Sequence, residues 1–175
     1  MTTSILFITH LSAVLLAGFA LWSMRFELGG KAATRLEWTI PTVLVVLAAA
    51  VLLIVSPGKR LELWAAAIAG GLVVGAFAGM ILKVNQDHGK RLIRVPPSWD
   101  GAGATALLLL LATVRFVSSS LMGRQSSGFG VLAGGATFLA AFIAARFIVL
   151  RFYKAARSIH IDMAHGQNPR RTLVH

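Results

Sequence analysis

Residues 83–101, KVNQDHGKRLIRVPPSWDG, form the longest polar stretch between apolar runs in this sequence. The run before it extends from Glu62 to Leu82, and the run after it extends from Ala102 to Met122. Each run has the roughly 20 residues that a helix needs to cross a bilayer core of about 30 Å. The polar stretch is therefore predicted to join two membrane-spanning helices.

Three further apolar runs complete the pattern. The five predicted spans cover residues 4–24, 38–55, 62–82, 102–122 and 129–152, and residues 153–175 form a tail. Hydrophobic residues make up 57% of the 175 residues and charged residues only 13%, which is far more apolar than a soluble domain. The sequence predicts an all-α integral membrane protein, a five-helix transmembrane bundle that uses residues 1–175 as one domain.

The opening stretch also indicates its own local structure. Asp87, His88 and Gly89 form a turn signal between two short segments of alternating character. Pro96 and Pro97 follow, and proline ends regular structure because it has no backbone N–H. We therefore expect a short β-hairpin-like loop between the third and fourth spans.

Basic residues are distributed unevenly over the polar segments. The segments on one side of the predicted spans contain three, four and five basic residues, 12 in all: Arg25, Lys31, Arg35, Lys83, Lys90, Arg91, Arg94, Arg151, Lys154, Arg157, Arg170 and Arg171. The other side has Lys59, Arg60 and Arg124. Since cytoplasmic loops are enriched in lysine and arginine, the N-terminus is predicted to lie outside, and the hairpin-like loop and C-terminus in the cytoplasm.

The formal net charge of +11 has a membrane interpretation as well. A nucleic-acid-binding protein gathers basic residues on a soluble face, often among aromatic residues, whereas here they lie between apolar runs, so no nucleic-acid partner is predicted. A basic side chain beside anionic headgroups gains on the order of 1 kcal/mol. The expected surface for lipid or a partner protein consists of Lys90, Arg91, Arg94, Arg151, Lys154 and Arg157.

Glycines at helical spacing mark two spans as packing helices. Gly71, Gly75 and Gly79 lie in the third span, and Gly130 and Gly134 lie in the fifth. Positions without a side chain let the backbone of another helix approach closely. Ordinary helix packing is the leading interpretation, and a sliding or gating seam is the alternative that the sequence leaves open.

Arg115 is a charged residue deep inside a predicted span, about 20 Å from the inner surface. A charge at that depth typically costs a few kcal/mol unless it faces protein or water and has a partner. Glu62 and His10 share its half of the bilayer, so we hypothesise an intramembrane polar cluster of these three residues. The alternative is a structural arginine that snorkels outward or bonds to residues 118–120. Arg146, near the inner end of its span, is expected to snorkel.

The sequence shows no pattern typical of an enzyme or cofactor site. Cysteine is absent, which excludes disulfides and thiolate ligands. His10 is the only histidine in a predicted span, so the chain cannot supply two such ligands to a haem. The spacing of His160, Asp162 and His165 does not place three ligands on one helix face. No catalytic residue, metal or cofactor is expected.

Residues 75–79, GAFAG, the polar segment DHGKRLIRVPPS and the Val114-Arg115-Phe116 end of the fourth span together resemble small bacterial membrane proteins of the CcdC-like group. The resemblance covers roughly residues 70–120. It implies a bacterial inner-membrane protein nominally associated with cytochrome c maturation. Because the chain has no cysteine, it could not itself relay thiols in such a pathway.

Two functions remain open at this point. The leading interpretation is a non-enzymatic accessory, assembly or scaffold subunit, which acts with a membrane-protein partner or with further copies of itself. The alternative is a small transporter or channel that uses Arg115, Glu62 and His10 as its polar site.

Overall fold

The computed structural model describes residues 3–29, 35–56, 61–82, 85–87, 92–94, 98–122 and 129–153. Its helices are α1 (Thr3–Ser23), α2 (Arg25–Leu28), α3 (Arg35–Ile54), α4 (Leu61–Ile81), α5 (Asp100–Met122) and α6 (Phe129–Ile148), and a π-helix, η2 (Val149–Tyr153), continues α6. Within these residues, five helices are long and apolar enough to cross a membrane, which agrees with the five predicted apolar helices.

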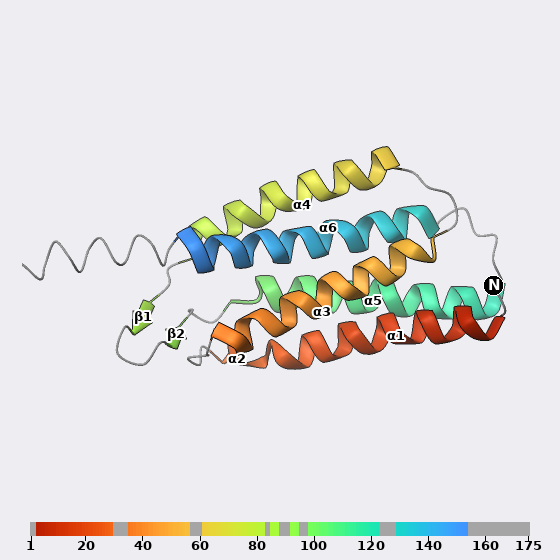
Figure 1. Ribbon diagram of the computed structural model, residues 1–175, viewed down its shortest axis with the longest axis horizontal. Coiled ribbons are helices and arrows are strands. Elements are labelled where there is room, and N and C mark those ends of the chain that lie inside the picture. Colours follow the sequence, from red (N-terminus) through yellow and green to blue (C-terminus); the bar gives the residue numbers. More distant parts are fainter. Residues whose placement is uncertain are drawn as a thin grey trace, which may run out of the picture.

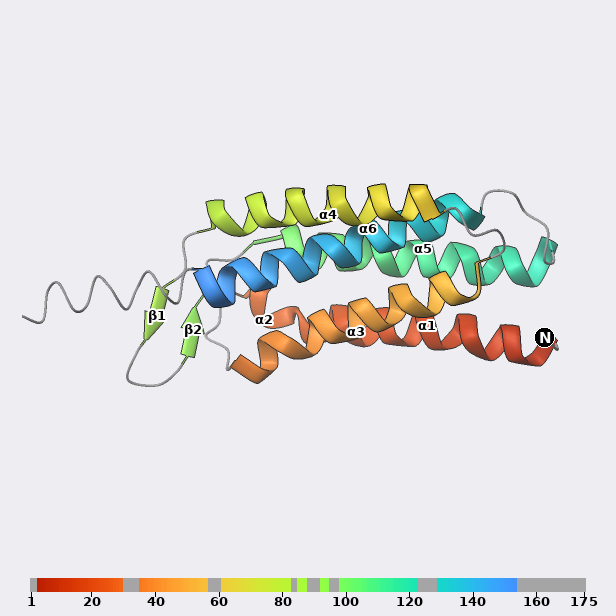
Figure 2. The same cartoon turned by 45° about the horizontal axis from the view of Figure 1, so that its top comes forward.

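The five long helices form a four-helix bundle with one peripheral helix. In the bundle, α1 packs between α3 and α5, and α6 packs against α3 and α5 on the opposite side. The remaining helix, α4, packs on α6 at the outside of the bundle (Figures 1 and 2). Figure 1 shows that α1, α4 and α6 end, and α5 begins, toward the end of the molecule where β1 and β2 lie.

Alanine dominates the centre of the bundle. The buried alanines of the core cluster are Ala13, Ala17, Ala20, Ala48, Ala49, Ala104, Ala112, Ala136 and Ala140. Larger apolar side chains, including Val45, Leu52 and Leu108, fill the space between them. Since lipid tails are as apolar as leucine, close packing of small residues is what holds membrane helices together.

The segment between the first two spans is more helical than expected. A short helix, α2, follows α1 directly and carries Glu27, and α3 begins at Arg35 rather than at Trp38. Pro41 therefore lies inside α3, beyond its first turn, where it offers no N–H to the carbonyl of Glu37. Residues 25–28 and 35–37, which the sequence placed between the first two spans, are therefore helical.

Two three-residue strands lie between α4 and α5. Strand β1 (Asn85–Asp87) pairs antiparallel with β2 (Leu92–Arg94), with Asn85 opposite Arg94 and Asp87 opposite Leu92. The expected turn at residues 88–91 lies outside the described residues, so the hairpin-like loop as a whole stays a prediction. Residues 154–175 of the tail also lie outside the described residues.

Candidate functional site

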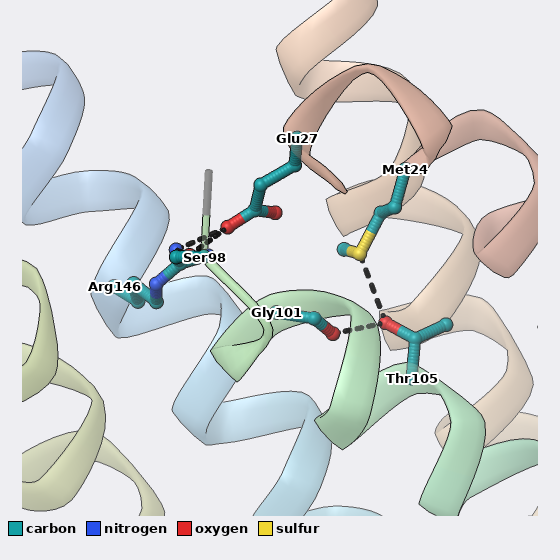
Figure 3. Close-up of polar contacts among 6 residues, drawn as sticks. All are labelled: Met24, Glu27, Ser98, Gly101, Thr105 and Arg146. Carbon is teal, nitrogen blue, oxygen red and sulfur yellow. Dashed lines mark hydrogen bonds and ion pairs between the residues drawn. The ribbon is translucent and has the colours of Figure 1, made fainter. Parts of the chain in front are cut away.

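A buried charged cluster lies at the end of the bundle near β1 and β2. Arg146 of α6 donates a hydrogen bond from Nη2 to Oε1 of Glu27 in α2, and the two side chains form an ion pair. The hydroxyl of Ser98, which precedes α5, accepts a 2.8 Å hydrogen bond from the same Nη2 and donates one of 2.8 Å to the same Oε1 (Figure 3). Glu27, Ser98 and Arg146 are called the polar triangle below.

The two charged members of the polar triangle are almost completely buried, and Ser98 is half-buried. Glu27 is 2% exposed and Arg146 is 3% exposed. The expectation that Arg146 snorkels is therefore wrong, because its guanidinium turns inward to a carboxylate from another helix. A buried carboxylate and guanidinium are tolerated when each supplies the other's charge and hydrogen bonds. The structure provides the opposite charge and hydrogen bonds at Nη2 of Arg146, whereas the buried Nε of Arg146 has no hydrogen-bond partner in the described part of the chain.

Gly101 gives the ion pair its space. A Cβ at this position would lie 2.6 Å from Nη1 of Arg146 and 2.6 Å from Oε2 of Glu27. The first turn of α5 can therefore pass the pair only where the chain has no side chain. Next to this contact, the hydroxyl of Thr105 lies 2.8 Å from the carbonyl oxygen of Gly101 and 3.1 Å from Sδ of Met24 (Figure 3).

The polar triangle ties together three segments that are far apart in the sequence. Its members come from the chain after α1, the chain before α5 and the end of α6. The hydroxyl of Ser98 both donates and accepts within the polar triangle. The arrangement is therefore suited to a structural role, in which it holds the three segments together. Among the described residues, no three acidic or histidine side chains gather as a metal site.

The predicted cluster around Arg115 is only partly brought together. Arg115 of α5 is 1% exposed and His10 of α1 is 5% exposed, so both are buried on two helices that pack together. The rings of Phe7 and Phe116, 5.1 Å apart, bring α1 and α5 into contact nearby. Glu62 is exposed at the start of α4, a helix that packs on α6, and it does not join the other two.

The His10 ring has a local partner in its own helix. Its Nδ1 lies 2.7 Å from the carbonyl oxygen of Leu6, one turn earlier. A carbonyl oxygen can only accept, so Nδ1 carries the proton in this contact, and Nε2 is the nitrogen left with a lone pair in the neutral ring. The hydrogen bond of the His10 ring is therefore made within α1 itself.

The glycines of α4 lie against the backbone of α6. A Cβ at Gly71 would collide with the carbonyl oxygen of Phe138, and one at Gly75 would collide with that of Phe142. At Gly79 the nearest atom would be Cβ of Val149, at 2.9 Å.

The glycines of α6 are arranged less tightly. A Cβ at Gly134 would lie 3.5 Å from the side chain of Leu63, which is an ordinary contact, and Gly130 is buried. The tight contact between α4 and α6 is thus made by the glycines of α4 and the carbonyls of α6.

The predicted basic surface is described in part. Arg151 of η2 donates a 3.3 Å hydrogen bond to the hydroxyl of Thr39, and its guanidinium lies 5.7 Å from the Phe147 ring and 5.6 Å from the Phe152 ring. Arg94 belongs to β2. Lys90, Arg91, Lys154 and Arg157 lie outside the described residues.

Sequence reasoning missed the polar triangle, although one signal pointed to it. Arg146 lies inside an apolar span, where a charge requires a partner, and the chain has only six acidic residues. Glu27, Glu37 and Asp100 all lie on the same predicted side of the membrane and within three residues of a predicted span end, so the sequence alone does not choose the partner among them.

No protein-family model, curated protein or solved structure matches this chain, so the resemblance to the CcdC-like group stays a prediction.

Proposed function

We propose that this protein is a non-enzymatic accessory, assembly or scaffold subunit of a larger complex in the bacterial inner membrane. The observation that carries the proposal is the position of α4. This helix packs on α6 by its glycine face, and its other apolar side chains remain exposed, among them Val73, Phe77 and Met80. In lipid, such a face can pack against a helix of a partner subunit by van der Waals contact.

The use of the buried charges supports the same proposal. Glu27 and Arg146 form an ion pair, and both form hydrogen bonds with Ser98. The interior of the bundle is filled mainly by alanine. These groups brace the helices, which is the role expected of a scaffold. The burial of Arg115 and His10 on two helices that pack together is the observation that favours the second candidate, a small transporter or channel.

The proposed orientation places the N-terminus outside and the C-terminus in the cytoplasm, with the basic surface on anionic lipid headgroups or on a partner protein. Reporter fusions test it. A fluorescent protein that folds only in the cytoplasm should be bright when fused after His175, and alkaline phosphatase should be active when inserted after Lys59. The same phosphatase inserted after Lys90 is the control and should be inactive. A dark fluorescent fusion after His175, together with phosphatase activity after Lys90 but not after Lys59, would reverse the orientation.

Purification in mild detergent separates the two candidate functions. An accessory subunit should bring down a larger membrane complex, and Arg115→Leu should reduce the yield of that complex several-fold by harming assembly. A transporter should instead move a solute alone in liposomes, and Arg115→Leu should abolish flux with the folded protein retained. Arg124→Leu is the control, because this arginine lies in the sequence between the last two predicted spans. Flux by the isolated protein would overturn the accessory role.

A further inference from the structure

An apolar groove runs between the peripheral helix and the bundle. It has a volume of about 860 Å³, with one wall on α4, the other on α5 and a floor on α6. Phe138 and Phe142 form the floor, and the walls include Val74 and Leu107. The groove exists because α4 and α5 both pack on α6 while making little contact with each other (Figure 2).

The mouth of the groove differs from its interior. Trp99 and Asp100 line it at the start of α5, opposite Ile81 and Leu82 at the end of α4. Trp99 is 77% exposed, and tryptophan prefers the boundary between lipid tails and headgroups. A carboxylate therefore lies at the level of the headgroups, above an apolar recess that reaches about 12 Å along α4, from Leu82 to Val74.

We propose that this groove binds one phospholipid with an ammonium headgroup. The acyl chains lie along Phe138 and Phe142, and the ammonium group donates to the carboxylate of Asp100. The volume lies within the roughly 300–1,000 Å³ of ligand sites. The apolar lining and the carboxylate at the mouth together favour a lipid with a cationic group in its headgroup.

The ammonium group matters because of its charge and its protons. Hydrogen bonds to a charged group are stronger than neutral ones, and phosphatidylethanolamine brings both features to Asp100. Phosphatidylcholine brings the charge without the protons, and phosphatidylglycerol brings neither. The expected order of retention is ethanolamine, then choline, then glycerol.

Native mass spectrometry of the full chain in mild detergent tests the proposal. The protein is incubated with equal amounts of dioleoyl phosphatidylethanolamine, phosphatidylcholine and phosphatidylglycerol, and the lipids retained per chain are counted. We expect one retained lipid, with ethanolamine about tenfold ahead of glycerol. Asp100→Asn should bring that ratio close to one while keeping a residue that favours helix starts. Glu62→Gln, which removes an exposed carboxylate of α4, should leave the ratio unchanged.

A second pair of variants tests the apolar part of the groove. Gly103 lines the groove, and a Cβ there would meet no atom within 4 Å, so Gly103→Leu should fill the space and lower retention of all three lipids about tenfold. Gly18 in α1 is equally open and does not line the groove, so Gly18→Leu is the matched control. Equal retention of the three lipids by the unmodified protein, or the same selectivity in Asp100→Asn, overturns the proposal. A copurified peptide lost only in Gly103→Leu also overturns it, in favour of a protein partner.

Discussion

Glu27→Ala is expected to lower the free energy of unfolding by roughly 3–5 kcal/mol, because it leaves the buried guanidinium of Arg146 without its carboxylate. Unfolding by SDS in mixed micelles, followed by tryptophan fluorescence, measures the loss. Glu62→Ala is the control, since Glu62 is exposed and should change the free energy by less than about 0.5 kcal/mol. A loss in Glu27→Ala no larger than in the control would show that the ion pair does not stabilise the fold.

Removal of both charges is expected to cost far less than removal of one. In the double variant Glu27→Leu, Arg146→Met, no charge remains buried, and apolar side chains of similar length occupy the space. We therefore expect most of the loss to be recovered, which a double-mutant cycle would record as a large coupling energy. If the losses of the two single variants simply add in the double variant, the two side chains are not coupled.

Gly75→Ala is expected to cost roughly 1–3 kcal/mol and to push α4 away from α6, because the added methyl group overlaps the carbonyl oxygen of Phe142. A backbone carbonyl cannot move aside as a flexible side chain can. The chain has no cysteine of its own, so separation of the helices can be measured by cross-linking in Leu63→Cys, Gly134→Cys. These positions contact each other between α4 and α6, and the rate of cross-linking should fall in Gly75→Ala.

Gly18→Ala is the matched control for this variant. It makes the same change in α1, where the new methyl group would meet no atom within 4 Å. We expect its stability to be unchanged or slightly higher, because alanine is the better helix former. Unchanged cross-linking and stability in Gly75→Ala would contradict the close contact between α4 and α6.

The spans could be predicted from composition because the bilayer imposes one length on every crossing helix. Helix neighbours could not be predicted in the same way. The spacing of Gly71, Gly75 and Gly79 indicates a close contact, but the partner groups are the carbonyls of Phe138 and Phe142. Every sequence has backbone carbonyls, so no pattern in residues 129–148 marks them as the partner.

The charged residues show the same limit. Arg146 and Glu27 are 119 positions apart, and helical periodicity carries no information over that distance. The depth of Arg115 in its predicted span correctly indicated that its side chain is buried. Glu62 was predicted as its partner only because both residues lie in the same predicted half of the bilayer. Two residues at one depth can lie on opposite sides of a bundle, and here α4 stands outside it.

The order in which the helices are synthesised differs from the order in which they acquire neighbours. The helix α4 leaves the ribosome before α5, yet its packing partner is α6, the last of the five. Before α6 is present, the glycine face of α4 lacks the helix that it packs on, and Glu27 of α2 lacks Arg146, which α6 carries. Packing of α6 therefore completes both contacts at once.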